Sequence, residues 1–175
     1  MSPSGCEESA GSAAQLDALV DLVVERLSLA RDVAAAKYGS GDPIDDPIRE
    51  QRVLRSAGCA LNVTPVGHRT GMQFFQDQIE ASKVIQRGLY HRWQRHPEEI
   101  PAANPDLAAD VRPKLDRITA QIIQQLKCMD EMPSFKPGDV ADLIDRVSAA
   151  VPDRQLPRLH RHAAAFAMRS LSAGV

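Results

Sequence analysis

The sequence predicts an all-α protein, a single-domain bundle of about six helices. Strand signals are weak, because aromatic residues make up only 4% of the chain and runs of alternating β-branched residues are rare. Apolar residues instead recur at steps of three and four between breaks marked by proline, which is the spacing of an amphipathic helix. A chain of 175 residues is long enough for one domain with a core, which we expect at residues 15–175.

Proline and glycine mark the boundaries of the predicted helices. Asp46-Pro47 is an N-cap followed by proline at the first helical position, and Thr64-Pro65 repeats that start signal. The four longer helices are therefore expected at residues 16–38, 46–62, 64–93 and 107–129, with breaks at 39–43, 96–105 and 133–138. Two shorter helices follow, one with Val140, Leu143, Ile144 and Val147 on its apolar face, the other with Leu159, Ala163, Phe166 and Ala167.

Charge and hydropathy argue against two classes of partner. Lys and Arg total 21 against 23 Asp and Glu, a formal net charge of −2, whereas nucleic-acid-binding proteins normally show a basic excess. No apolar run is long enough to span a bilayer, so we expect a soluble protein that binds neither nucleic acid nor membrane. Residues 1–14 are rich in Ser, Gly and Ala and are expected to form a flexible leader, as if a starting Met had replaced a natural signal peptide.

The three cysteines give no metal or disulfide framework. Cys6, Cys59 and Cys128 are far apart and none belongs to a CxxC pair, which argues against a zinc site. A bridge between Cys59 and Cys128 stays open, but two unpaired buried thiols are the expectation. The cysteines therefore do not identify the compartment.

Two cations of the first helix occupy positions where apolar residues are expected. Arg26 and Lys37 share one stripe with the apolar residues Leu19, Val23, Ala30 and Val33. Eleven residues are about three turns, so both side chains emerge on the same side, roughly 16 Å apart along the axis. Buried cations must be paired, reach the surface or line a cavity. For either residue alone, an ion pair for Arg26 or a solvent-reaching ammonium for Lys37 is the simpler interpretation.

The third helix carries neutral polar residues in the same kind of position. Ser82 and Gln86 are one turn apart, on a stripe with Phe75, Ile79, Leu89 and Trp93. A buried Gln needs partners for both its amide nitrogen and its carbonyl oxygen. A structural hydrogen bond to a neighbouring helix is again the simpler interpretation for one residue alone.

Further polar candidates lie at the starts of the second and fourth helices. Asp46 fits an N-cap, and Glu50 fits a first-turn acid that complements the helix dipole. Arg49 lies between them, and Arg112 directly precedes Pro113 and is equally explained as a solvated arginine.

Three of the predicted helices direct cations or neutral hydrogen-bond donors toward the interior of the bundle. Together these residues predict a binding site for a compact anion with two carboxylates. The sequence contains no HExxH, GxSxG, phosphate-loop or glycine-rich dinucleotide motif. His160 and His162 are two residues apart, and two alternating histidines alone do not indicate a metal site. We therefore expect no metal, no cofactor and no activated water.

An ordered set of these residues resembles the all-helical chorismate mutases. The set comprises Glu25-Arg26-Leu27, Lys37, Asp46-x-x-Arg49-Glu50 and Gln78-Ile79-x-x-Ser82-x-x-x-Gln86, and the resemblance covers about residues 16–126. Minimal cytoplasmic members of that family are a helical hairpin swapped between two subunits. The greater length of this chain and its C-terminal helices resemble the secreted subclass, in which one chain supplies a complete site.

The resemblance implies an isomerase that converts chorismate to prephenate by Claisen rearrangement, without a cofactor. The implied catalytic residues are Arg26, Lys37 and Gln86. Arg26 would bind a substrate carboxylate, Lys37 the ether oxygen and a carboxylate, and Gln86 would donate a second hydrogen bond to that ether oxygen.

The remaining implied substrate-binding residues surround these three. Arg49 and Glu50 would lie near the ring hydroxyl and ring carboxylate, with Asp46 in support. Ser82 would contact a carboxylate. Arg112 is the candidate for the fourth-helix arginine that replaces one from a partner subunit, and its placement requires a one-residue gap in the comparison.

The resemblance also implies a homodimer and a periplasmic or secreted location, with the cytoplasm left open. Gln86 follows the cytoplasmic pattern, since some secreted members have a carboxylic acid at that position. Secreted members also close their C-terminal region with a disulfide, and here no cysteine follows Cys128. We therefore expect that bridge to be missing.

Two other functions fit parts of the pattern. A lyase on the same scaffold, which splits isochorismate into pyruvate and salicylate, would also need Arg26 and Lys37. The Asp46-x-x-Arg49-Glu50 and Ser82/Gln86 pattern favours the mutase. A non-catalytic helical interaction module would instead use the inward polar groups as a buried network.

Overall fold

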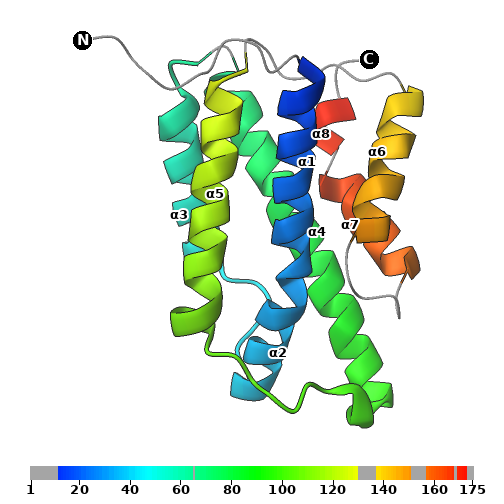
Figure 1. The fold of residues 1–175 in the computed structure, drawn as a ribbon. Helices are drawn as coiled ribbons and strands as arrows, with labels where there is room; N and C mark the ends of the chain where they lie inside the picture. Colours follow the sequence, from blue (N-terminus) through cyan, green and yellow to red (C-terminus); the bar gives the residue numbers. More distant parts are fainter. Residues whose placement is uncertain (1–11, 65, 130–136, 151–156, 168, 173–175) are drawn as a thin grey trace.

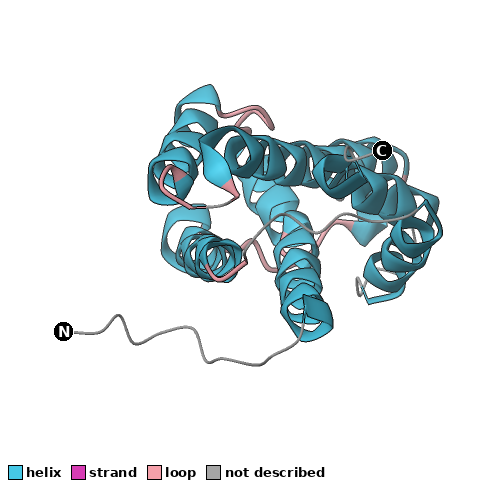
Figure 2. Cartoon of the chain, turned by 90° about the horizontal axis from the view of Figure 1, so that it is seen from above, coloured by secondary structure: helices cyan, strands magenta, loops and turns pink. Residues whose placement is uncertain are grey.

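The computed structural model describes residues 12–64, 66–129, 137–150, 157–167 and 169–172. All regular elements within these ranges are helical (Figure 2), which confirms the predicted all-α class and its six main helices. The elements are α1 (Ser12–Ser28), α2 (Ala30–Ser40), α3 (Pro47–Leu61), α4 (Gly67–Arg95), η1 (Pro97–Glu99), η2 (Leu107–Val111), α5 (Arg112–Lys127), α6 (Pro137–Ala150), α7 (Pro157–Ala167) and α8 (Arg169–Ser172). Most of the predicted leader and of the break at 133–138 lies outside the described residues.

The predicted first helix is interrupted at Leu29, which separates α1 from α2. The Ser28 hydroxyl donates to Glu25 O at 2.7 Å, and Leu29 N reaches the same oxygen only at 3.4 Å. A side-chain hydroxyl that competes for a helix carbonyl loosens the regular bond at that turn. The two helices nevertheless continue end to end (Figure 1), so the apolar stripe passes through the joint. All six of its predicted members are buried: Leu19, Val23, Arg26, Ala30, Val33 and Lys37.

The end of α2 and the start of α3 agree with the sequence signals. Gly41 has φ 75° and its N–H donates to Lys37 O, a left-handed C-cap that glycine adopts without a Cβ penalty. Asp46 caps α3, accepting from Arg49 N at 3.0 Å, and Pro47 is the first helical residue. The loop between these caps crosses from α2 to the base of α3.

The predicted N-cap of α4 at Thr64 is two residues too early, because Val66 occupies that position. The Thr64 hydroxyl donates to Leu61 O at 2.8 Å, so it forms a hydrogen bond at the C-terminal end of α3. It accepts from Gly67 N only at 3.3 Å, and α4 begins at Gly67. Pro65 lies outside the described residues.

The predicted fourth helix begins with a π-helical turn, η2, before α5 continues. Asp106 caps this turn by accepting from Ala108 N at 2.7 Å and Ala109 N at 2.9 Å. Pro113 has no N–H to donate to the preceding turn. A π-helical turn accommodates one extra residue in a helix, and Arg112 is the first residue of α5 directly after it.

Helix α4 lies at the centre of the bundle and packs against α2, α3 and α7, while α1 packs against α5 and α6 (Figure 1). The largest fully buried side chains of the core include Phe74, Phe75, Leu89 and Trp93 of α4. None of the described helices is both long and apolar enough to cross a membrane.

The C-terminal helices are attached to the face of α4 that carries Asp77 and Gln78. Asp77 is fully buried and accepts from Arg169 Nη2 of α8 at 2.6 Å. Gln78 Nε2 donates to Ala167 O at the end of α7 at 2.7 Å. These contacts hold the C-terminal helices against α4.

The cysteine prediction was wrong in two respects. Cys128 forms a disulfide bond, although we expected unpaired thiols. Cys59 is free, so it is not the partner of Cys128, and it is exposed instead of buried. Sequence spacing did not identify the pairing, because the fold decides which thiols meet.

Candidate active site

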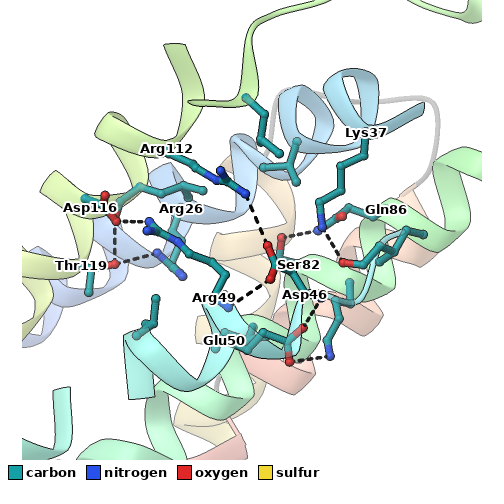
Figure 3. Close-up of a pocket in the computed structure, with 17 residues that line it drawn as sticks. Arg26, Lys37, Asp46, Arg49, Glu50, Ser82, Gln86, Arg112, Asp116 and Thr119 are labelled. Carbon is teal, nitrogen blue, oxygen red and sulfur yellow. Dashed lines mark hydrogen bonds and ion pairs between the residues drawn. The ribbon is translucent and has the colours of Figure 1, made fainter. Parts of the chain in front are cut away.

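A pocket opens between α1–α2, α3, α4 and α5, with about 720 Å³ of empty space that includes open solvent. All eight predicted site residues line it (Figure 3): Arg26, Lys37, Asp46, Arg49, Glu50, Ser82, Gln86 and Arg112. Apolar contacts come from Val33, Ile44, Val53, Ile79, Leu107 and Leu115.

Arg26 reaches the pocket from the last turn of α1 and is only 7% exposed. Its Nη1 donates to Thr119 Oγ1 of α5 at 3.0 Å. Burial, and then the neighbouring charge of Arg49, lower the pKa of the Arg26 guanidinium to about 10, so it is charged at neutral pH. Its Nε is buried and has no hydrogen-bond partner among the described residues, which leaves a donor for a ligand.

Lys37 enters the pocket from the last turn of α2 and is also 7% exposed. Its Nζ donates to Ile44 O at 2.6 Å, which fixes the ammonium but uses only one of its three protons. Burial lowers the pKa of Lys37, and the carboxylates of Asp46 and Glu50 offset that effect only in part.

Arg26 and Lys37 differ from the other pocket cations in their partners. Within the described ranges, no carboxylate lies within 4.0 Å of either charge, whereas Arg49, Lys83 and Arg112 each form an ion pair. The structure therefore does not support the ion-pair interpretation for Arg26 or the solvent-reaching interpretation for Lys37. An unpaired buried charge is costly, and an anion in the pocket would compensate both.

Gln86 and Ser82 face the pocket from α4 as predicted. Gln86 Nε2 donates to Ser82 Oγ at 3.0 Å (Figure 3), and Gln86 Oε1 is buried without a partner among the described residues. A serine hydroxyl both donates and accepts. The amide can therefore turn over, accept from Ser82 through Oε1 and present Nε2 to a ligand, with no net loss of hydrogen bonds.

The start of α3 holds Asp46 and Glu50 in a reciprocal cap. Asp46 Oδ1 accepts from Arg49 N at 3.0 Å, and Glu50 Oε1 accepts from Asp46 N at 3.2 Å. Asp46 Oδ2 also accepts from Arg112 Nη2 at 3.4 Å. The capping residue therefore joins α3 to α5 and lines the pocket as well.

Three polar residues of the pocket were not predicted: Lys83, Asp116 and Thr119. Asp116 pairs with Arg49, and Thr119 accepts from Arg26. Asp116 and Thr119 are four and seven residues after Arg112, so the three share a face of α5. That spacing was a readable signal.

The charges around the pocket suit a dianion. Three carboxylates and five cations line it, which leaves a formal charge of +2: Asp46, Glu50 and Asp116 against Arg26, Lys37, Arg49, Lys83 and Arg112. This excess is local, because the whole chain has a formal charge of −2.

One cluster in the described part of the chain has ligand atoms close enough for a metal ion. It comprises His96, Glu98 and Glu99, which follow α4 and do not line the pocket. Glu99 is already bound to the Arg92 guanidinium, at 2.6 Å for one contact.

Comparison with known proteins points to one family. The family model described as chorismate mutase type II matches residues 13–87. The chain is 29% identical over 165 residues to the secreted chorismate mutase of Mycolicibacterium smegmatis, a match that covers 93% of this chain and 88% of that protein. It is 31% identical over 121 residues to the secreted chorismate mutase of Yersinia pestis, with coverage of 69% and 63%.

A solved structure shows the same architecture over nearly its full length. The crystal structure of chorismate mutase from Burkholderia phymatum superposes with a TM-score of 0.76 at 31% sequence identity. The superposition covers 91% of this chain and 99% of that one. The similarity therefore includes the C-terminal helices, which lie beyond the residues that the family model matches.

Proposed function

Because the chain belongs to the chorismate mutase type II family and has that family's activity, we propose that the polar pocket is where chorismate rearranges to prephenate. The observation that carries this proposal is the pair of buried cations, Arg26 and Lys37, which lack carboxylate partners among the described residues. Chorismate is a dianion, and its two carboxylates would supply the missing counter-charges.

Conformational restriction is the first contribution of the pocket. The rearrangement is unimolecular, so no nucleophile or proton transfer is needed. The substrate must instead be held in its reactive diaxial shape. Arg26 binds one carboxylate and Arg112 contributes from α5, while Arg49 and Glu50 contact the ring end and Ser82 a carboxylate. Holding a near-attack geometry lowers the entropic part of the barrier.

Electrostatic stabilisation of the breaking ether bond is the second contribution. As the C–O bond lengthens, negative charge develops on the ether oxygen. Lys37 Nζ and, once its amide has turned over, Gln86 Nε2 are the donors for that charge. Lys37 is already tied to Ile44 O at 2.6 Å, so its ammonium needs little reorganisation, which is how preorganised donors favour a transition state.

The proposal extends to location, with the protein working in the periplasm or outside the cell. The relatives from Mycolicibacterium smegmatis and Yersinia pestis are named as secreted enzymes. The disulfide at Cys128 also supports an oxidising compartment. A homodimer remains the expectation from the resemblance, although the pocket is lined by residues of one chain.

The proposed site is tested by following the loss of chorismate absorbance with the product identified. Wild-type protein should form prephenate, and Lys37→Ala should lose about 10²- to 10³-fold in kcat while keeping its helical circular dichroism. Lys114→Ala is the matched control, because Lys114 is an exposed lysine of α5 outside the pocket. Wild-type-like turnover by Lys37→Ala would refute the role of Lys37. Release of pyruvate and salicylate from isochorismate, without prephenate from chorismate, would indicate the lyase.

A further inference from the structure

Lys83 is a buried cation at the edge of the pocket whose side chain contacts three carboxylates. Its Nζ lies 3.1 Å from Asp45 Oδ1, 3.0 Å from Glu50 Oε2 and 2.9 Å from Glu80 Oε1. These groups come from the loop before α3, from α3 and from α4 itself. Burial lowers the pKa of Lys83, but the hydrogen bonds to Glu80, Glu50 and Asp45 together raise it above the ordinary lysine value. The ammonium is therefore charged at neutral pH.

Of the three carboxylates that contact Lys83, only Glu50 lines the pocket. Its two oxygens are held by different partners: Oε2 accepts from Lys83, and Oε1 accepts from Asp46 N at 3.2 Å. A carboxylate held at both oxygens has one orientation. Because it is ionised beside a fixed cation, it only accepts hydrogen bonds.

The charge of Lys83 matters for a dianionic ligand. The pocket has a formal charge of +2 with Lys83, and its removal would leave +1. It would also leave Glu50 without its cation beside a ligand of the same sign. Like charges brought together in a partly buried site oppose binding.

We propose that Lys83 is a positioning residue that acts through Glu50: it fixes the Glu50 carboxylate as an acceptor for the substrate hydroxyl and cancels its charge toward the substrate dianion. This inference rests on the proposed function. It assigns a role in substrate binding to Lys83, which is one position away from the apolar stripe of α4. Of the three carboxylates that contact Lys83, it gives only Glu50 a part in binding.

The test compares steady-state KM and kcat for chorismate in wild type, Lys83→Met, Lys83→Arg and Asp45→Asn. Lys83→Met should raise KM about tenfold with kcat within about threefold of wild type, and Lys83→Arg should recover most of the loss because it retains the charge. Asp45→Asn is the matched control. It removes an ion pair of nearly the same length from the same ammonium, but Asp45 does not line the pocket, so KM should not change.

A double variant tests whether Lys83 acts through Glu50. In a Glu50→Gln background, Lys83→Met should change KM by less than about twofold, because no charged carboxylate remains for Lys83 to hold. An equal rise in KM in both backgrounds would overturn the proposal, as would an unchanged KM in Lys83→Met or an equal rise in Asp45→Asn.

Two further results keep the test decisive. If Lys83→Met does not fold, Lys83→Gln, which keeps a donor without the charge, is measured in both backgrounds and interpreted in the same way. If wild-type protein does not convert chorismate, the proposed function itself fails. Failure of the Lys83 inference alone would instead show normal wild-type turnover with an unaffected Lys83 variant.

Discussion

The amide of Gln86 is bonded to the hydroxyl of Ser82, one turn away on α4, at 3.0 Å. The pair defines which end of the amide remains available, since Ser82 takes one end and the other has no partner among the described residues. In the arrangement seen, Ser82 takes Nε2 and the free end is Oε1, so Gln86 donates to the ether oxygen after its amide turns over and accepts from Ser82 instead. Two neutral groups achieve this, and neither depends on protonation.

Replacing Gln86 by Glu should move the activity optimum to acidic pH. A glutamate donates a hydrogen bond to the ether oxygen only when it is protonated, so kcat/KM of Gln86→Glu should rise as pH falls. Wild type should be flat over the same mildly acidic range. The measurement is kcat/KM against pH, with Gln121→Glu on the exposed face of α5 as the control. Equal activity of Gln86→Glu at neutral and acidic pH would exclude Gln86 from the ether contact.

Wild-type activity should begin to fall at a lower alkaline pH than it would if Lys37 had an ordinary lysine pKa. The ammonium is the active form of Lys37, and burial lowers its pKa, so the proton is lost sooner as pH rises. The kcat/KM profile, which reports the free enzyme, should show this alkaline decline. Lys37→Arg should move the decline to higher pH, up to the limit set by Arg26, whose pKa burial lowers to about 10. Recovery of wild-type activity on return to neutral pH would distinguish titration from unfolding, and a decline that is identical in Lys37→Arg would contradict the assignment.

Thr119→Val should weaken substrate binding without disrupting the fold. The hydroxyl of Thr119 accepts from Arg26 at 3.0 Å and donates to Leu115 O at 2.7 Å. Valine keeps the shape but leaves Arg26 without its fixed partner, and a hydrogen bond to a charged group is worth about 1.5–3 kcal/mol. We expect kcat/KM to fall by about tenfold, mostly through KM. Thr119→Ser, which retains the hydroxyl, should be close to wild type, and a loss as large as that of valine would assign the effect to packing.

A reducing agent should lower the thermal stability of the wild-type protein. Cys128 forms a disulfide, and removing a native bridge typically costs about 2–4 kcal/mol. Thermal unfolding of Cys128→Ser should therefore match that of reduced wild type and should not respond further to the reductant. Cys59→Ser is the control, because Cys59 is free and exposed. An unchanged melting temperature after verified reduction would contradict a stabilising role.

The buried stripe of the first predicted helix could be predicted from the sequence, because a short interruption does not change which residues share a helix face. Arg26 and Lys37 remain on one face although the helix is interrupted at Leu29. Asp46 fits the predicted cap and also lines the pocket: one oxygen caps α3 and the other accepts from Arg112.

The residues that were missed depend on packing that spacing does not report. Lys83 is adjacent to Ser82, so helical rotation alone places it beside the predicted stripe, and only the approach of α3 makes that position buried. Asp116 and Thr119 are the exception: they share a face of α5 with Arg112, and that spacing could have identified them. The pairing of Cys128 was equally beyond reach, because it requires distances in the folded chain.

The pocket is lined by residues of one chain, from Arg26 of α1 to Thr119 of α5, and this arrangement has a genetic consequence. Each copy carries all five cations of the pocket, so an inactivating substitution is expected to damage only the copy that carries it. A defective allele expressed beside an intact one should therefore lower total activity in proportion to its dose, without inhibiting the protein made from the intact allele. Loss-of-function alleles of the proposed site are expected to be recessive.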